Sequence, residues 1–144
     1  MIILHVIALV SQADVIVPPY VEPGAWNVVS RVVDITVPGV PGFLVRMARG
    51  KSKAEHKRVA QGQRVDALLA PDPKARCRIE SQSVADGRYA QTLACPQKKG
   101  APLQIVRSGS YDASGFAGQA IVTGTTPKGA LHIILDQRAS RIGA

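Results

Sequence analysis

The sequence predicts a mainly β fold, an antiparallel meander that forms a curled sheet or an open barrel, with one short helix. Three observations lead to this prediction. Residues 26–37 are rich in β-branched side chains, five strand candidates follow one another in the C-terminal half, and turn signals separate them at short intervals. Sequential strands joined by short turns usually pair with their neighbours, which favours a meander. With 144 residues, the chain is expected to form one domain.

The first residues suggest an export signal. Residues 2–10 form an apolar run, and Ser11, Gln12 and Ala13 have the small-x-small pattern of a signal-peptidase site. The run is far too short to span a bilayer as a helix, and no Lys or Arg precedes it, so a strand-like N-terminus is the alternative. We favour a signal segment over residues 1–13, a single β domain over residues 14–144, and a location in the periplasm or outside the cell.

The next elements follow from apolar patterns and from the residues that break them. Residues 26–37 predict a long strand, and Pro and Gly residues at 38–42 end it. Residues 43–47 are a second strand candidate. Further on, Val65, Leu68 and Leu69 lie at helical spacing and predict the one short helix, which ends before Pro71.

A basic stretch runs from Arg46 to Arg64, with Glu55 as its single acidic residue. The simplest interpretation is a solvated strand edge followed by a loop. The alternative is a patch for an anionic surface, in keeping with the formal net charge of +8. No aromatic side chain lies between these charges to stack on bases, so nucleic acid is not expected as a partner. The candidate patch consists of Arg46, Arg49, Lys51, Lys53, Lys57 and Arg58.

A β-hairpin with a cysteine at the far end of each arm is expected over residues 77–95. Taking residues 85–87 as a three-residue loop, with Gly87 in the left-handed region, brings Cys77 opposite Cys95. Directly opposed residues lie about 4.5–5.5 Å apart at Cα, which a disulfide can span. A two-residue loop would place the cysteines on opposite faces, so the disulfide and the loop length are linked. The alternative is two separate buried thiols.

Alternation along the two arms of this hairpin predicts which side chains share a face. One face carries an apolar end and the other is largely polar. The first face collects Cys77, Ile79, Ser81 and Ser83 with Tyr89, Gln91, Leu93 and Cys95.

Three more strands are expected over residues 104–111, 116–123 and 130–139. In the last, His132 and Asp136 share a face but lie about 13 Å apart along the strand, so a surface strand is favoured over a catalytic pair. The chain has no phosphate-binding loop, no dinucleotide fingerprint and no cluster with the spacing of metal ligands. We therefore expect no catalytic residues, no cofactor and no metal.

Several short motifs resemble a known family. Pro23–Asn27 stands where that family has Pro-Gly-x-Trp-Glu, Ser108–Tyr111 and Phe116–Gly118 match its later hairpin, and Arg141–Gly143 matches its tail. On these motifs, from Pro23 to the C-terminus, the chain resembles the bacterial DUF3617 family of small exported proteins, found mostly in Gram-negative species. The resemblance implies a strand, a break, a short helix and a Cys-flanked hairpin.

The departures from the family pattern are informative as well. Asn27 replaces the usual Glu, which puts any role of that carboxylate in doubt. Two further cysteines that members often carry are both missing here, as expected if those two pair with each other. The resemblance thus implies an exported chain and supports Cys77–Cys95 as the remaining bridge, but it supplies no activity and no site residues.

The expected function is that of a non-catalytic exported protein of the cell envelope, with a binding or supporting role. Its partner is expected to be an anionic envelope component or a small apolar ligand. The second partner corresponds to an alternative function, a carrier with a barrel-like cavity, because the chain has few aromatic and many small side chains. The small side chains that could leave such space are Ala90, Ala94, Ala117 and Ala120.

Overall fold

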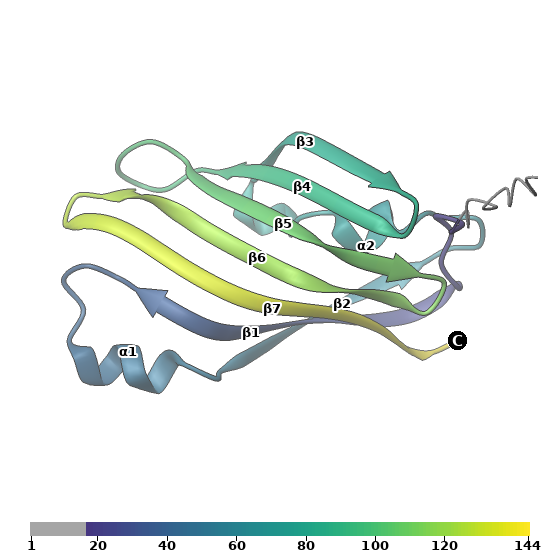
Figure 1. The fold of residues 1–144 in the computed structure, drawn as a ribbon, viewed down its shortest axis with the longest axis horizontal. Coiled ribbons are helices and arrows are strands. Elements are labelled where there is room, and N and C mark those ends of the chain that lie inside the picture. The colour runs from purple at the N-terminus through teal and green to yellow at the C-terminus, as the bar shows by residue number, and fades with distance from the viewer. Residues whose placement is uncertain (1–16) are drawn as a thin grey trace, which may run out of the picture.

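The computed structural model describes residues 17–144, so the expected signal segment lies outside the described residues. Strands dominate this range, with two α-helical segments and one 3-10 turn between them (Figure 1). The elements are β1 Gly24–Thr36, α1 Gly42–Ala48, β2 Ser52–Val59, α2 Asp66–Leu69, η1 Pro73–Ala75, β3 Arg78–Ala85, β4 Arg88–Cys95, β5 Leu103–Asp112, β6 Gly115–Thr126 and β7 Gly129–Gly143.

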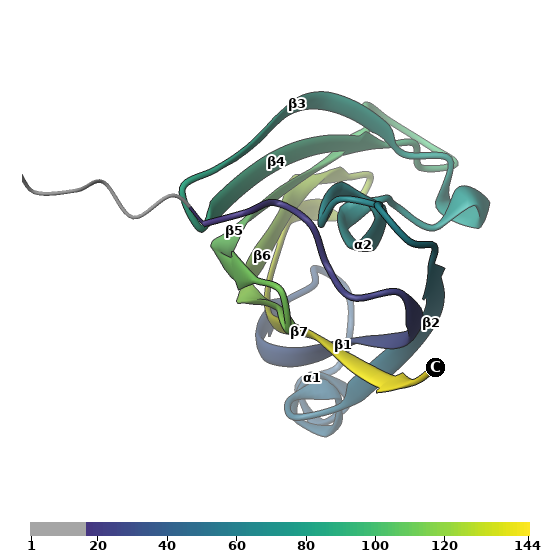
Figure 2. The same cartoon turned by 90° about the vertical axis from the view of Figure 1, so that its right-hand side faces the viewer.

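The seven strands form one sheet with the order β2-β1-β7-β6-β5-β4-β3. From β3 to β7 each strand pairs antiparallel with the next, so the predicted meander is confirmed. The first strand, β1, then pairs with β7 on one side and β2 on the other. Viewed end-on, the sheet curls around α2 without joining its two edge strands, β2 and β3 (Figure 2). The predicted curled, open sheet is therefore also confirmed.

One end of the curl is filled by large apolar side chains. Trp26 on β1 and Leu68 and Leu69 on α2 are completely buried there. The rings of Tyr89 and Phe116 meet edge to face, with centroids 5.2 Å apart. The predicted short helix is thus confirmed as α2. It is buried because its two leucines pack against the apolar side chains on the concave face of the sheet.

The chain before β1 crosses this filled end (Figure 2). Tyr20 forms an isolated antiparallel bridge with Arg64, and the Val65 amide donates to the Pro19 carbonyl oxygen at 2.7 Å. The indole Nε1 of Trp26 donates to the Glu22 carbonyl oxygen at 2.9 Å. These bonds attach the lead-in both to α2 and to the tryptophan that fills the curl.

The second strand candidate, residues 43–47, is wrong, because this segment forms the helix α1. An apolar run of this length carries no periodicity that separates strand from helix. Local preferences decide instead: Leu44, Arg46 and Met47 are good helix formers, and Pro41 immediately precedes the first helical residue. Of the basic residues that follow, Lys53, Lys57 and Arg58 lie on β2, which is an edge strand of the sheet.

The hairpin has a two-residue loop instead of the predicted three-residue loop. Asp86 and Gly87 both have positive φ, 54° and 77°, as a type I′ turn requires, and Ala85 pairs with Arg88. The disulfide between Cys77 and Cys95 is nevertheless present. A bulge between Ile79 and Ser81 adds one residue to β3 and restores the register that the shorter loop would have shifted.

The predicted apolar face of this hairpin is therefore confirmed on one arm only. Along β4, Tyr89, Gln91, Leu93 and Cys95 are all buried, as the alternation predicts. On β3 between the bulge and the turn, Ser81 and Ser83 are exposed, and the half-buried residues are Gln82 and Val84. No helix in residues 17–144 has the length and apolar character needed to cross a membrane.

Candidate functional site

The concave side of the sheet is hollow beyond α2. A cavity of about 550 Å³ lies between the sheet, the inner side of β2 and the linker that contains η1. Strands from across the sheet contribute its apolar walls, because inward-facing residues alternate with exposed ones along each strand. The apolar side chains that line it include Val28, Leu68, Leu93, Ile105, Ala120 and Leu135.

Arg107 projects from β5 into this apolar cavity wall. Arg107 is only 6% exposed, and its guanidinium carbon lies 5.6 Å from the centre of the Phe116 ring. The side chain donates from Nη1 to the Leu69 carbonyl oxygen and to Gln91 Oε1, both at 2.9 Å, and from Nε to Gln137 Oε1 at 2.8 Å. Arg107 therefore fastens the end of α2 to three strands of the sheet while still lining the cavity.

A chain of polar side chains continues on both sides of Arg107. Gln137 donates from Nε2 to the Ser30 hydroxyl at 3.0 Å, which extends the chain to β1. On the other side, Gln91 donates from Nε2 to Gln82 Oε1 at 2.7 Å and to the Leu69 carbonyl oxygen at 2.9 Å. Amide side chains thus accept hydrogen bonds from Nε and Nη1 of the buried guanidinium without supplying an opposite charge.

The charge of Arg107 is not matched by an adjacent carboxylate. Among residues 17–144, none of the ion pairs includes Arg107. Its three hydrogen bonds within the described chain use Nε and Nη1, and none of them uses Nη2. Burial lowers the pKa of the guanidinium from its ordinary value, while the Tyr89 phenol and the Glu55 carboxylate act in the opposite direction. The group remains charged at neutral pH, because an arginine keeps its proton under such conditions.

A comparison with known protein families gives a match over residues 21–144 to a family described as a protein of unknown function (DUF3617). The chain belongs to the DUF3617 family. Comparisons with curated proteins and with solved structures gave no match. The family description names no activity.

The motifs that resemble the family lie around the filled end of the curl. Gly109 and Gly118 face each other across β5 and β6, and a Cβ on either would collide with backbone atoms and with the Tyr89 hydroxyl. Tyr111 pairs with Phe116 two positions further on. These glycines therefore make space for a buried tyrosine, and this part of the DUF3617 pattern is explained by packing.

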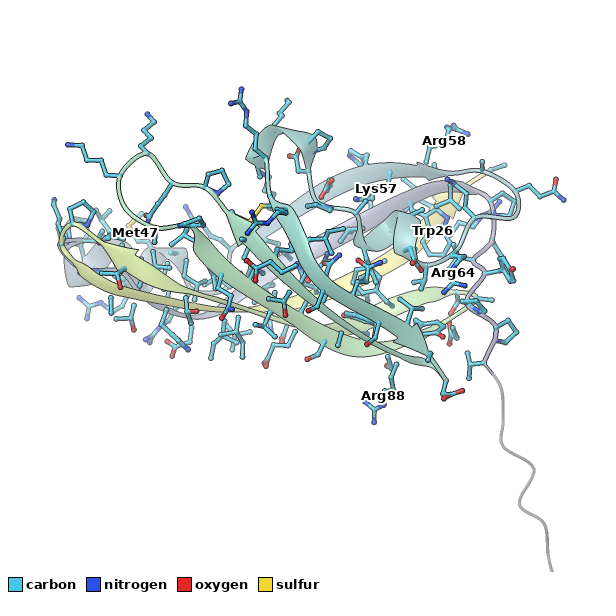
Figure 3. The ribbon with its side chains drawn as sticks, turned by 90° about the horizontal axis from the view of Figure 1, so that it is seen from above. Trp26, Met47, Lys57, Arg58, Arg64 and Arg88 are labelled. Atoms are coloured by element: carbon cyan, nitrogen blue, oxygen red, sulfur yellow. A yellow bond between two sulfur atoms is a disulfide. The ribbon has the colours of Figure 1, made fainter. Side chains whose placement is uncertain are left out.

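The six residues of the predicted anionic-surface patch do not form one surface. Lys57 turns inward with its side chain 13% exposed, donates to the Ala70 carbonyl oxygen and lies 3.5 Å from the Glu55 carboxylate. Lys53 lines the cavity, whereas Arg49 is paired with Asp34 at 3.0 Å. Along the long axis, Arg58 and Met47, the neighbour of Arg46, lie towards opposite ends (Figure 3).

Other residues considered from the sequence are also spread over the molecule. His132 and Asp136 are both exposed, and Asp136 is 3.5 Å from Arg31 in a surface ion pair. Of the four alanines expected to leave interior space, Ala120 lines the cavity, while Ala90 and Ala117 are exposed. Within residues 17–144, no three His, Cys, Asp or Glu side chains converge as metal ligands would.

Sequence reasoning placed Gln91 on the inner face of the hairpin but missed Arg107 and Gln137. The positions of the residues in β5 could have revealed Arg107. Ile105, Arg107 and Tyr111 are separated by even numbers of residues, so their side chains lie on the same face of the strand. An arginine in phase with apolar residues predicts either a bulge or a buried guanidinium. Gln91 on β4 lies directly opposite Arg107, whereas Gln137 on β7 lies opposite Gly118, two residues away from the row that contains Arg107, Ala120 and Leu135. The pairing register therefore predicts the contact with Gln91 but not the one with Gln137.

Proposed function

We propose that this DUF3617 protein is a non-catalytic exported binding protein whose cavity holds a small amphipathic anion, such as a medium-chain carboxylate. The observation that carries this is the buried guanidinium of Arg107, which forms no ion pair within residues 17–144 and lines a cavity with both aliphatic and polar side chains. An unpaired buried charge is costly, and a ligand anion would compensate it. The ligand's apolar body would contact the aliphatic walls.

The size and lining of the cavity support a small-molecule ligand. Its volume of about 550 Å³ lies inside the range of roughly 300–1,000 Å³ typical of such sites. Apolar walls with a few convergent polar groups are also the usual composition of a ligand pocket. Lys53 and Lys74 add positive charge at the border of the cavity, and Glu55 and Asp72 offset it there, so Arg107 is the main determinant of the preference for an anion.

Export is part of the proposal and is supported by the disulfide. Cys77 and Cys95 are the only cysteines of the chain, and both are used in one bridge. Stable disulfides are typical of oxidising compartments, including the bacterial periplasm. Cys77 also lines the cavity, so the bridge holds β3 and β4 together next to the binding site.

The test compares a carboxylate with its neutral counterpart. Full-length protein is loaded with a fluorescent fatty acid, and decanoate and decanol are used to displace it. Decanoate is expected to compete about tenfold or more better than decanol, because its carboxylate can pair with Arg107 in a desolvated site. The decanoate recovered afterwards is expected to be chemically unchanged, as the non-catalytic role requires.

A matched pair of variants locates the binding site. Ile105→Trp places a large side chain in the cavity, whereas Val106→Trp places the same side chain on the 40% exposed outer position next to it. Probe binding is expected to be lost in the first variant and kept in the second. Equal displacement by decanoate and decanol, equal behaviour of the two variants, or no probe binding at all would each refute the proposed function.

A further inference from the structure

The helix α1 exposes apolar side chains to solvent. Phe43 is 57% exposed, Leu44 43% and Met47 60%, and Val40 just before the helix is 38% exposed. With about 100° of rotation per residue, Phe43, Leu44 and Met47 fall on one side of the helix. Val45 and Ala48 fall on another side and are half-buried, and α1 contacts β1. The apolar residues on the exposed side therefore have no counterpart within the described chain.

Two further loops lie at the same end of the molecule. The side chain of Lys128, in the turn between β6 and β7, lies next to Gly39 in the segment that leads into α1. Gln97, in the loop between β4 and β5, donates to the Thr125 carbonyl oxygen at 2.8 Å near that same turn. Figure 1 shows α1, the β6–β7 turn and the β4–β5 loop at the end opposite to the C-terminus.

This end, which we call the α1 end, is rich in basic residues. It comprises residues 37–51, 96–102 and 126–129, and none of these ranges contains Asp or Glu. Arg49 at this end pairs with Asp34 on β1 at 3.0 Å. The cations of the α1 end are Arg46, Arg49, Lys51, Lys98, Lys99 and Lys128.

We propose that the α1 end docks on an anionic lipid bilayer, with Phe43, Leu44 and Met47 entering the headgroup region. Apolar side chains on a short surface helix, flanked by cations, are the combination by which amphipathic segments bind membrane interfaces. Each cation near an anionic surface adds attraction that falls off within a Debye length. A second copy is disfavoured as the occupant, because pairing two α1 ends would bring like charges together without acidic partners.

Docking through α1 does not require a ligand in the cavity. A fluorescent probe attached to the protein can show which part of the surface contacts the membrane. Both native cysteines are in the disulfide, so an introduced cysteine is the only thiol to label. Met47→Cys and Ile142→Cys, at 60% and 56% exposed positions, carry the environment-sensitive fluorophore NBD in otherwise identical full-length chains. Vesicles contain phosphatidylglycerol or, for comparison, phosphatidylcholine alone.

The probe at position 47 is expected to brighten and shift to the blue with phosphatidylglycerol vesicles, and not with phosphatidylcholine. The probe at position 142 is expected to keep its emission in both. Charge reversal by Lys98→Glu with Lys99→Glu should weaken vesicle affinity about tenfold or more, because two attractive cations become repulsive. The matched pair Arg58→Glu with Arg88→Glu, away from α1 (Figure 3), changes net charge equally and should weaken affinity much less.

Several outcomes would overturn membrane docking by α1. They are an unshifted probe at position 47, equal shifts at positions 47 and 142, an equal response to both lipids, and equal effects of the two charge reversals. A blue shift of the probe at position 47 without vesicles, accompanied by doubling of the native mass, would instead identify a second copy as the occupant.

Discussion

A single residue, Arg107, connects α2, β4 and β7 on the concave side of the sheet. Replacing it by Met removes the donors to the Leu69 carbonyl oxygen, Gln91 and Gln137. The Leu69 carbonyl oxygen keeps its hydrogen bond from Gln91 Nε2, but Gln91 Oε1 and Gln137 Oε1 lose their donor. We expect this to lower the free energy of unfolding by about 3 kcal/mol, partly offset by removal of a buried charge. Urea denaturation of Arg107→Met measures the loss. Arg138→Met, at an exposed position, is the control and should change stability by less than about 0.5 kcal/mol.

Tyr89 is expected to make the free energy of unfolding depend on pH in the alkaline range. Burial raises the pKa of its phenol above the ordinary value of 10.0, and the charge of Arg107 acts in the opposite direction. Because the folded state keeps the proton more tightly, Tyr89 contributes stability that is fully present below pH 10.0 and is lost as pH rises through the folded-state pKa.

The comparison of wild type with Tyr89→Phe tests this pH dependence. Urea midpoints measured from about pH 9 to 11 should fall more steeply for the wild type than for the variant, because only the wild type carries the phenol that the unfolded chain ionises first. Parallel pH profiles would show that the phenol has the same pKa in both states.

The elements of the sheet depend on glycines that admit large side chains. A Cβ at Gly118 would collide with the Ser108 carbonyl oxygen and the Tyr89 hydroxyl, so Gly118→Ala is expected to cost about 2 kcal/mol or more. Gly143→Ala, where no atom lies within 4 Å of the added Cβ, should be close to neutral. Thermal unfolding of the two variants checks this, and equal melting temperatures would contradict the packing role of Gly118.

Strands were predictable from the sequence at this scale because their signals are local. The alternation within residues 104–111 and the turn signals around them predict β5 and its neighbours, with ends within a few residues of the observed ones. The α1 helix was not predictable, because residues 43–47 are too few to show a period. The hairpin loop was also mistaken, since the register depends on both the turn at Asp86–Gly87 and the bulge before Ser81.

The whole molecule has an uneven interior. Trp26, the α2 leucines and the two aromatic rings fill one end of the curl, and the cavity occupies the space beyond them. The sequence predicts that the sheet curls, but it does not predict which part of the interior remains a cavity. The position of the cavity depends on how much of the concave side α2 fills. The same tertiary arrangement buries Arg107, which explains why the candidate site was missing from the sequence prediction while the disulfide was not.

The proposed binding function requires that Arg107 pairs with the anionic group of a ligand in the cavity. Its most direct test is the NMR signal of the Arg107 Nε–Hε group in the full-length protein, followed during titration with decanoate. The signal is expected to shift and saturate with decanoate and to change little with decanol, while the signal of the exposed Arg138 serves as an internal control. An Arg107 signal that decanoate leaves unchanged, or that both compounds shift equally, would contradict the claim.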